Sequence, residues 1–244
     1  MTATAQTIEP IRPAPDPTRR TARAAGILYL LTFVSMPTLA LYQHVRQQPD
    51  FVLGSGGTTG VLWGALSEVV VAFACIGTAV VLFPVAKRQS ETAAVGFVAS
   101  RVMEGTLIVV GVVSVLTMTT LRQSAAGADP AALLVTGRAL SAAYDWTFLL
   151  SQSLLPVVNA LCLGTVLYRS GLVPRILPLI GLIGAPLLLL SDIAIFFGLL
   201  DRTSPWVLLG ALPIAVWEFS LGVYLVVRGF RPAAVATLYA RPPH

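Results

Sequence analysis

Long apolar stretches recur along this chain and dictate its fold class. About 20 helical residues cross the hydrocarbon core of a bilayer. Stretches of roughly that length or longer cover residues 24–42, 59–86, 92–121, 141–167, 175–199 and 205–227. Only 11% of the residues are charged, against ~25% in soluble domains. The sequence therefore predicts an all-α, polytopic membrane helix bundle with six transmembrane helices in one domain, residues 23–231.

The two ends of the chain lack this apolar character. Residues 1–22 are rich in Pro, Ala, Thr and Arg, a composition that cannot bury enough apolar surface to fold. They are predicted to form a disordered cytoplasmic tail, and residues 232–244 a cytoplasmic C-terminal tail.

The basic residues predict which way the bundle is inserted. With the N-terminus inside, eleven of the sixteen Lys and Arg residues fall on the inner side and Arg101 lies within a span; the outer four are Arg46, Arg122, Arg138 and Arg202. Short cytoplasmic loops of membrane proteins carry an excess of Lys and Arg. Both termini are therefore expected in the cytoplasm, and the net charge of +5 is explained by insertion.

Six ionisable residues lie within the apolar stretches. They are Arg101, Glu68, Glu104, Asp145, Asp192 and Glu218. A charged side chain at bilayer depth costs ~2.5–3.5 kcal/mol even on the most lenient scale, and such residues face the bundle interior or a wet cavity. Any chemistry of this protein is expected among them.

Small residues accompany two of the carboxylates at helical spacing. Ala65 and Ala72 share a helical face with Glu68, and Ala215 and Gly222 share one with Glu218. Small residues allow membrane helices to approach closely. Both glutamates are therefore predicted to point at other helices.

The third stretch places Arg101 and Glu104 three residues apart, which makes them neighbours on a helix surface. A pair of this kind lowers the cost of insertion and needs no ligand. Alternatively, Arg101 holds Glu104 ionised and orients a second carboxylate or an anionic group of a substrate.

The fourth stretch carries Asp145, Gln152 and Asn159 at seven-residue intervals, which return nearly to the same helical face. This polar stripe predicts either hydrogen bonds between helices or one wall of a hydrated path. Asp192 occupies a comparable face of the fifth stretch.

Several other functions find no support in the sequence. His44 and His244 are the only histidines, so no histidine metal site is expected, and neither a metal nor another cofactor is predicted. The basic residues are spread over several loops, which argues against nucleic acid as a partner. Cys75 and Cys162 lie within spans and are interpreted as small buried apolar residues.

Several sequence runs resemble a known bacterial membrane family. They are residues 20–31, Glu68, Arg-Val-Met-Glu-Gly from Arg101, Tyr-Arg-Ser-Gly-Leu-Val-Pro-Arg from Tyr168, and the run from Trp217 to Arg231. Over residues 20–231 the chain resembles the domain of unknown function 4386. The resemblance implies a multi-pass protein of the bacterial cytoplasmic (inner) membrane, and it implies no particular activity.

Three functions fit these features. The first is a metal-independent acid-base enzyme acting on a lipid-soluble substrate such as an isoprenoid, because a carboxyl group removed from water can serve in proton transfer. Its predicted catalytic residues are Glu68, Glu218 and Asp192. Its predicted binding or orienting residues are Arg101, Glu104, Asp145, Gln152, Asn159 and Trp217.

The alternative is a small proton- or cation-coupled transporter that uses the same carboxylates, as intramembrane acids often do. The second alternative is a non-catalytic membrane assembly protein in which the charges lock helix packing. The expected partners are membrane lipid together with a lipid-soluble molecule, a proton or a cation.

Overall fold

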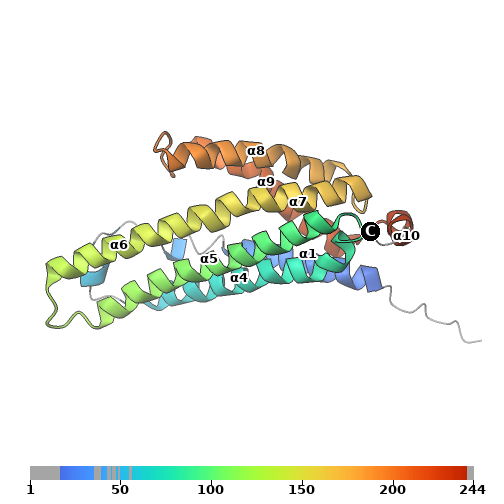
Figure 1. Ribbon diagram of the computed structural model, residues 1–244. Helices are drawn as coiled ribbons and strands as arrows, with labels where there is room; N and C mark the ends of the chain where they lie inside the picture. The colour runs from blue at the N-terminus through green and yellow to red at the C-terminus, as the bar shows by residue number, and fades with distance from the viewer. Residues whose placement is uncertain are drawn as a thin grey trace, which may run out of the picture.

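The computed structural model describes residues 17–35, 40–42, 45, 48, 50–54 and 57–240, and this part of the chain contains helices and no strands (Figure 1). The elements are α1 (Pro17–Thr32), η1 (Phe33–Ser35), η2 (Phe51–Leu53), α4 (Thr59–Ala86), α5 (Glu91–Gln123), α6 (Pro130–Phe148), η3 (Leu149–Leu154), α7 (Leu155–Ser170), α8 (Ile176–Phe196), α9 (Pro205–Val227) and α10 (Pro232–Ala240). The prediction of an all-α membrane helix bundle is confirmed.

The long helices close into a ring. Following the contacts around the bundle, α1 packs on α4, α4 on α5, α5 on α7, α7 on α8, α8 on α9, and α9 back on α1. The ring places six different helices around one interior. Polar side chains on the inward faces can therefore meet there even when they are far apart in sequence.

Five helical segments are long and apolar enough to cross a membrane: residues 59–86, 91–123, 130–170, 176–196 and 205–227. The first predicted span, 24–42, is not among these five segments. Its described helix, α1, has 16 residues, continues as η1 to Ser35, and is followed by residues 36–39, which lie outside the described part. The predicted count of six spans therefore stays a prediction.

The helical run that contains the fourth predicted span is longer than the prediction. The sequence predicts residues 141–167, but α6, η3 and α7 form one helical run from Pro130 to Ser170. At 1.5 Å per residue this run is about 60 Å long, about twice the ~30 Å hydrocarbon core. The run is therefore longer than one membrane crossing requires. We call the end of the bundle that carries the α5–α6 turn the hairpin end.

The opposite end of the bundle, which we call the basic end, carries the α4–α5 and α7–α8 turns. Exposed cations gather there, among them Lys87, Arg88, Arg175 and Arg228. The predicted orientation would place this basic end in the cytoplasm and stays a prediction.

Both described ends of the chain lie at the basic end, and both are helical where tails were predicted. The helix α1 begins at Pro17, so residues 17–22 are part of the bundle, and Ala22 is fully buried. Residues 232–240 form α10, whose Leu238 is 3% exposed. The remaining tail residues, 1–16 and 241–244, lie outside the described part.

At the hairpin end, Arg122 fastens the short helix η2 to α5. Its Nη1 donates to the carbonyl of Phe51 at 2.9 Å, and its guanidinium carbon lies 4.5 Å from the centre of the Phe51 ring. A Cβ at Gly54 would lie 3.0 Å from the Arg122 Nη2. Glycine at position 54 therefore leaves the room that the guanidinium occupies.

We expect Arg122→Gln to loosen η2. The substitution removes a charge-assisted hydrogen bond and the cation–π contact, and bonds of this kind contribute about 1.5–3 kcal/mol. Faster amide hydrogen exchange at residues 51–54 measures the effect, with Gln123→Ala on the neighbouring exposed side chain as the control. Unchanged exchange in Arg122→Gln would contradict this role.

The α8–α9 loop also meets the hairpin end. Arg202 of this loop donates from Nη1 to the backbone carbonyl of Asp145 on α6. Beside it, hydrogen bonds from the amide and hydroxyl of Thr203 hold the pKa of Asp201 below its ordinary value. The loop therefore keeps an ionised carboxylate at this surface and ties α8 and α9 to α6.

Candidate functional site

A polar cluster fills the middle of the ring. Arg101 of α5 is 1% exposed. Its Nη1 lies 3.1 Å from Glu104 Oε2, and its Nη2 lies 2.6 Å from Glu218 Oε1 on α9. One guanidinium thus bridges two carboxylates from different helices, and we call this group the Arg101 cluster.

Two further helices complete the Arg101 cluster. Asn159 of α7 donates from Nδ2 to Glu104 Oε2 at 2.7 Å, and Ser100 donates to the Asn159 side-chain carbonyl. The thiol of Cys75 on α4 lies 3.5 Å from Glu104 Oε1. Glu104 therefore accepts hydrogen bonds from α4, α5 and α7, which fixes its position.

Two buried aromatic rings lie against the guanidinium of Arg101. The guanidinium carbon lies 5.1 Å from the centre of the Tyr29 ring on α1 and 5.6 Å from that of Phe97. Both rings are within the distance at which a cation is attracted to an aromatic face. The first helix thereby takes part in the cluster through an aromatic side chain.

A second group, the Glu68 group, lies nearer the hairpin end. Glu68 of α4 is 2% exposed. Its Oε1 accepts from the hydroxyl of Tyr144 on α6 at 2.8 Å and from the amide of Gln152 on η3 at 3.3 Å. Tyr144 also packs edge-on against Tyr42, with ring centres 5.4 Å apart.

We expect Tyr144→Phe to destabilise the bundle through Glu68. Removing a donor to a buried charged group costs about 1–3 kcal/mol, and the Tyr144 hydroxyl lies closer to Glu68 Oε1 than the Gln152 amide does. Thermal unfolding in detergent measures the effect, with Tyr239→Phe on the exposed helix α10 as the control. In Glu68→Gln, the same tyrosine substitution should cost less; equal costs in both backgrounds would show that the two side chains are not coupled.

The third group consists of Asp192 on α8 and Ser153 on η3. Asp192 is 3% exposed, and its Oδ1 accepts from the Ser153 hydroxyl at 2.5 Å. Its Oδ2 is buried and has no hydrogen-bond partner. Among the described residues no cation pairs with Asp192.

The π-helix between α6 and α7 explains how neighbouring residues donate hydrogen bonds to both Glu68 and Asp192. Residues 149–154 form a π-helix, in which the Leu155 amide donates to the Leu150 carbonyl five residues earlier. Pro156 follows directly and has no amide hydrogen to donate. Gln152 and Ser153 are consecutive on this π-turn, and they reach carboxylates on opposite neighbours, α4 and α8.

The remaining two predicted site residues lie elsewhere. Trp217 is fully buried in the α8–α9 contact, where a Cβ at Gly181 would lie 2.8 Å from its Cε2. Its described surroundings are packing contacts. Asp145 lines a pocket at the hairpin end, so the seven-residue stripe of the fourth span does not form one wall.

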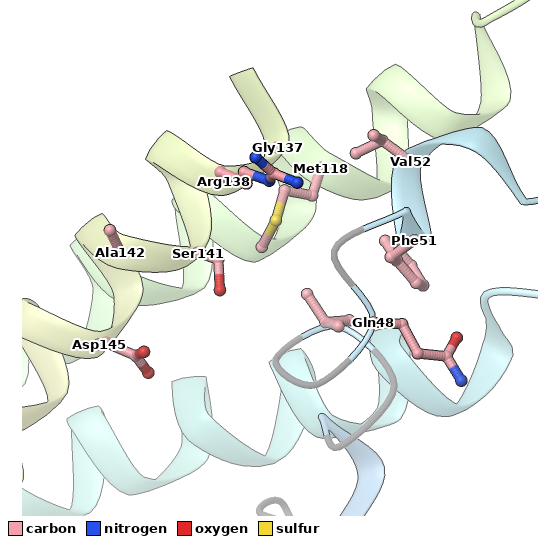
Figure 2. Close-up of a pocket in the computed structure, with 10 residues that line it drawn as sticks. Gln48, Phe51, Val52, Met118, Gly137, Arg138, Ser141, Ala142 and Asp145 are labelled. Atoms are coloured by element: carbon pink, nitrogen blue, oxygen red, sulfur yellow. The ribbon is translucent and has the colours of Figure 1, made fainter. Parts of the chain in front are cut away.

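This pocket has a volume of about 340 Å³ and lies between η2, α5 and α6 (Figure 2). Arg138, Ser141 and Asp145 contribute its polar side chains from α6, together with Gln48. Figure 2 shows Ser141 and Asp145 extending from α6 toward the segment that carries Gln48 and Phe51. Neither Glu68 nor any member of the Arg101 cluster lines it.

Sequence patterns missed several members of these groups. They are Tyr29, Cys75, Ser100, Tyr144 and Ser153. The available signal for Cys75 was its spacing of seven residues from Glu68, and Ser100 stands directly before Arg101. No regular helical pattern could predict the position of Ser153, because the π-turn changes the direction of the side chains along this segment.

Comparison with known proteins identifies the family and nothing beyond it. A family model described as a domain of unknown function (DUF4386) matches residues 24–229. No curated protein and no solved structure matches the chain. The matched region includes every residue of the Arg101 cluster, the Glu68 group and the Asp192 pair. The chain is therefore an integral membrane protein that belongs to the DUF4386 family.

Proposed function

We propose that this protein is a membrane transporter whose interior carboxyl groups bind the proton or cation that drives transport. One observation carries the proposal: the described interior holds more carboxyl groups than cations. Arg101 faces two of them, Glu104 and Glu218, and within the described part of the chain no cation pairs with Asp192.

An uncompensated charge in a low-dielectric interior is costly. A carboxyl group there is stable when it carries a proton or holds a cation, and intramembrane acids commonly mark ion paths. The excess carboxyl groups therefore provide binding capacity for at least one positive charge. An assembly role explains the Arg101 cluster as helix packing, but it offers no reason for a lone carboxyl at Asp192.

The depths of the carboxyl groups also suit an ion path. Arg101 lies ten residues from the start of α5, or about 15 Å along the helix, which is the middle of a ~30 Å core. Asp192 lies sixteen residues from the start of α8, or about 24 Å. The groups thus occupy two levels, one central and one nearer the hairpin end.

The acid-base enzyme predicted from the sequence needs space for a substrate beside its acid. The 340 Å³ pocket is lined by Asp145 but by none of the three predicted catalytic residues, Glu68, Glu218 and Asp192. We favour the alternative of ion-coupled transport, because a carboxyl group binds a proton without such a space.

Purified protein in sealed vesicles tests the proposal. The vesicles contain dyes that respond to H⁺, Na⁺ or K⁺, a gradient of the same ion is imposed, and a deproteinised cell extract supplies solutes. We expect ion movement that depends on the gradient and on the protein. Its absence under all three gradients would overturn the proposal, as would conversion of an isoprenoid lipid by detergent-solubilised protein with no ion movement in vesicles.

Glu218→Gln tests, in the same measurement, whether the Glu218 carboxyl group takes part in ion movement. It leaves Arg101 paired with Glu104 alone, so charge is balanced and the bundle should remain folded. We expect ion movement to fall at least several-fold while thermal stability is kept. Glu91→Gln, on an exposed glutamate of the α5 first turn, should move ions like the wild type; full activity of Glu218→Gln would remove Glu218 from the path.

A further inference from the structure

We infer that Asp192 and Ser153 form a proton-binding site, and that the proton bound there is the coupling ion. This inference rests on the proposed transport function and specifies its ion and one of its sites. Three features of the structure carry it: the isolation of the Asp192 carboxyl, the small number of ligands around it, and the π-turn that holds Ser153.

The isolation of Asp192 is nearly complete. Asp192 belongs to an apolar helix, α8, and its Oδ2 is buried without a hydrogen-bond partner. A buried ionised oxygen in this position would be left without the solvation that it has in water. A carboxyl that carries a proton on Oδ2 avoids this charge, and Oδ1 still accepts the hydrogen bond from Ser153.

Among the described residues, no charged side chain from the elements packed around Asp192 takes the place of the proton. The π-helix η3 contributes Ser153, and its Gln152 donates to Glu68 on α4, away from Asp192. On α9, Gly210 lies against Ser191, and Glu218 is bound to Arg101 eight residues further along. On the α8–α9 loop, Arg202 binds the Asp145 carbonyl, and on α7, Asn159 binds Glu104.

The ligand count argues for a proton over a metal cation. Hard metal cations take several oxygen ligands, six to eight for Ca²⁺, whereas a proton needs one oxygen. Ser153 supplies the single described hydrogen-bond partner of the Asp192 carboxyl. Among the described residues no group of three His, Cys, Asp or Glu side chains is placed to hold a metal ion.

The π-turn connects this site to a second buried carboxylate, Glu68. Turns of this type are often found at functional sites. Because Gln152 and Ser153 are adjacent, one short segment contacts both Glu68 and Asp192. Binding or release of a proton at Asp192 changes what Ser153 contacts, and any movement of the turn is passed to Gln152 and hence to Glu68.

Infrared difference spectroscopy between acidic and alkaline samples tests the site itself. We expect the wild type to show the carbonyl band of a protonated, buried carboxyl that is absent from Asp192→Asn. Asp201→Asn, on the exposed loop aspartate, should keep the band. A band that is unchanged in Asp192→Asn would overturn the inference.

A measurement on the wild type covers the case in which Asp192→Asn does not fold. Labelling the protein with isotope-labelled aspartate should shift the band, and labelling with isotope-labelled glutamate should leave it in place. The reverse result assigns the proton to a glutamate and overturns the inference. Loss of the band on adding Na⁺ at constant pH would also overturn it, because a metal ion would then compete for the site.

The vesicle measurement separates this inference from the proposed function. If Asp192→Asn moves ions as fast as the wild type under a pH gradient, the coupling site is elsewhere, and transport itself stands. If the wild type moves no ions, transport fails, whatever the infrared band shows. Ser153→Ala should alter the pH at which the band appears; an identical titration in Ser153→Ala would exclude the hydroxyl from the site.

Discussion

Replacing Arg101 by leucine is expected to destabilise the bundle severely. The substitution removes the one described cation beside Glu104 and Glu218 and leaves both carboxylates facing each other without a counter-ion. Breaking a buried ion pair by removing one partner costs about 3–5 kcal/mol. Arg101 is 1% exposed, so water cannot take its place, and a large loss of thermal stability in detergent is the expected result.

A set of related variants shows whether charge is the cause. Arg228→Leu removes an exposed arginine at the basic end and should have a small effect. Replacing the whole group, Arg101→Leu with Glu104→Gln and Glu218→Gln, should recover much of the lost stability, because replacing all members of a buried ionic group is often nearly neutral. A triple variant as unstable as Arg101→Leu alone would contradict the electrostatic explanation.

Gly26→Leu is expected to separate α1 from α9. A Cβ at Gly26 would lie 2.7 Å from the Gly222 carbonyl oxygen and 2.8 Å from the Val226 amide nitrogen. Both are backbone atoms, so a rotamer change cannot relieve the contact. Overpacking of this kind costs about 1–3 kcal/mol, and leucine adds three further carbons beyond the Cβ.

The displacement of α1 should also uncover the Arg101 cluster. Tyr29 lies three residues from Gly26, on the same face of the helix, and covers the guanidinium of Arg101. Cys75, which is 1% exposed, reports on this change through its reaction with a membrane-permeant thiol reagent in a Cys162→Ala background. We expect slow labelling in the wild type and clearly faster labelling in Gly26→Leu.

Gly60→Leu serves as the matched control for Gly26→Leu. The nearest atom to a Cβ at Gly60 is the Leu41 Cδ2 at 3.9 Å, an ordinary packing distance, so the stability and the labelling of Cys75 should stay close to the wild type. Equal effects of the two leucines would mean that the α1–α9 contact does not set the position of α1.

Helical spacing predicted the pairing of Arg101 with Glu104, because neighbours at three residues meet on any regular helix. It also predicted inward-facing positions for Glu68 and Glu218. The partners of these glutamates could not be predicted in the same way. Periodicity shows which face of a helix is polar but not which helix lies opposite, so the bond between Arg101 and Glu218, 117 residues apart, depends on the order of helices around the ring.

The fourth span shows where regular spacing fails. Asp145, Gln152 and Asn159 were expected on one face, yet Gln152 reaches Glu68, Asn159 reaches Glu104, and Asp145 lines a pocket at the hairpin end. The π-turn before Pro156 changes the rotation of the helix between them. A pattern that assumes 3.6 residues per turn therefore misplaces side chains across this segment.

Apolar composition and helical spacing are sufficient to predict a bundle of membrane helices with ionisable side chains turned inward, because water-free hydrocarbon leaves no other favourable place for the backbone or for the charges. The grouping of those charges becomes visible only in the folded bundle. One arginine holds two glutamates in the middle of the ring, and Asp192 remains with a serine as its single described partner. The physical reason is that pairing depends on distances between helices, which are set by packing contacts such as those at Gly26 and Gly181 and which leave no regular signal along the chain.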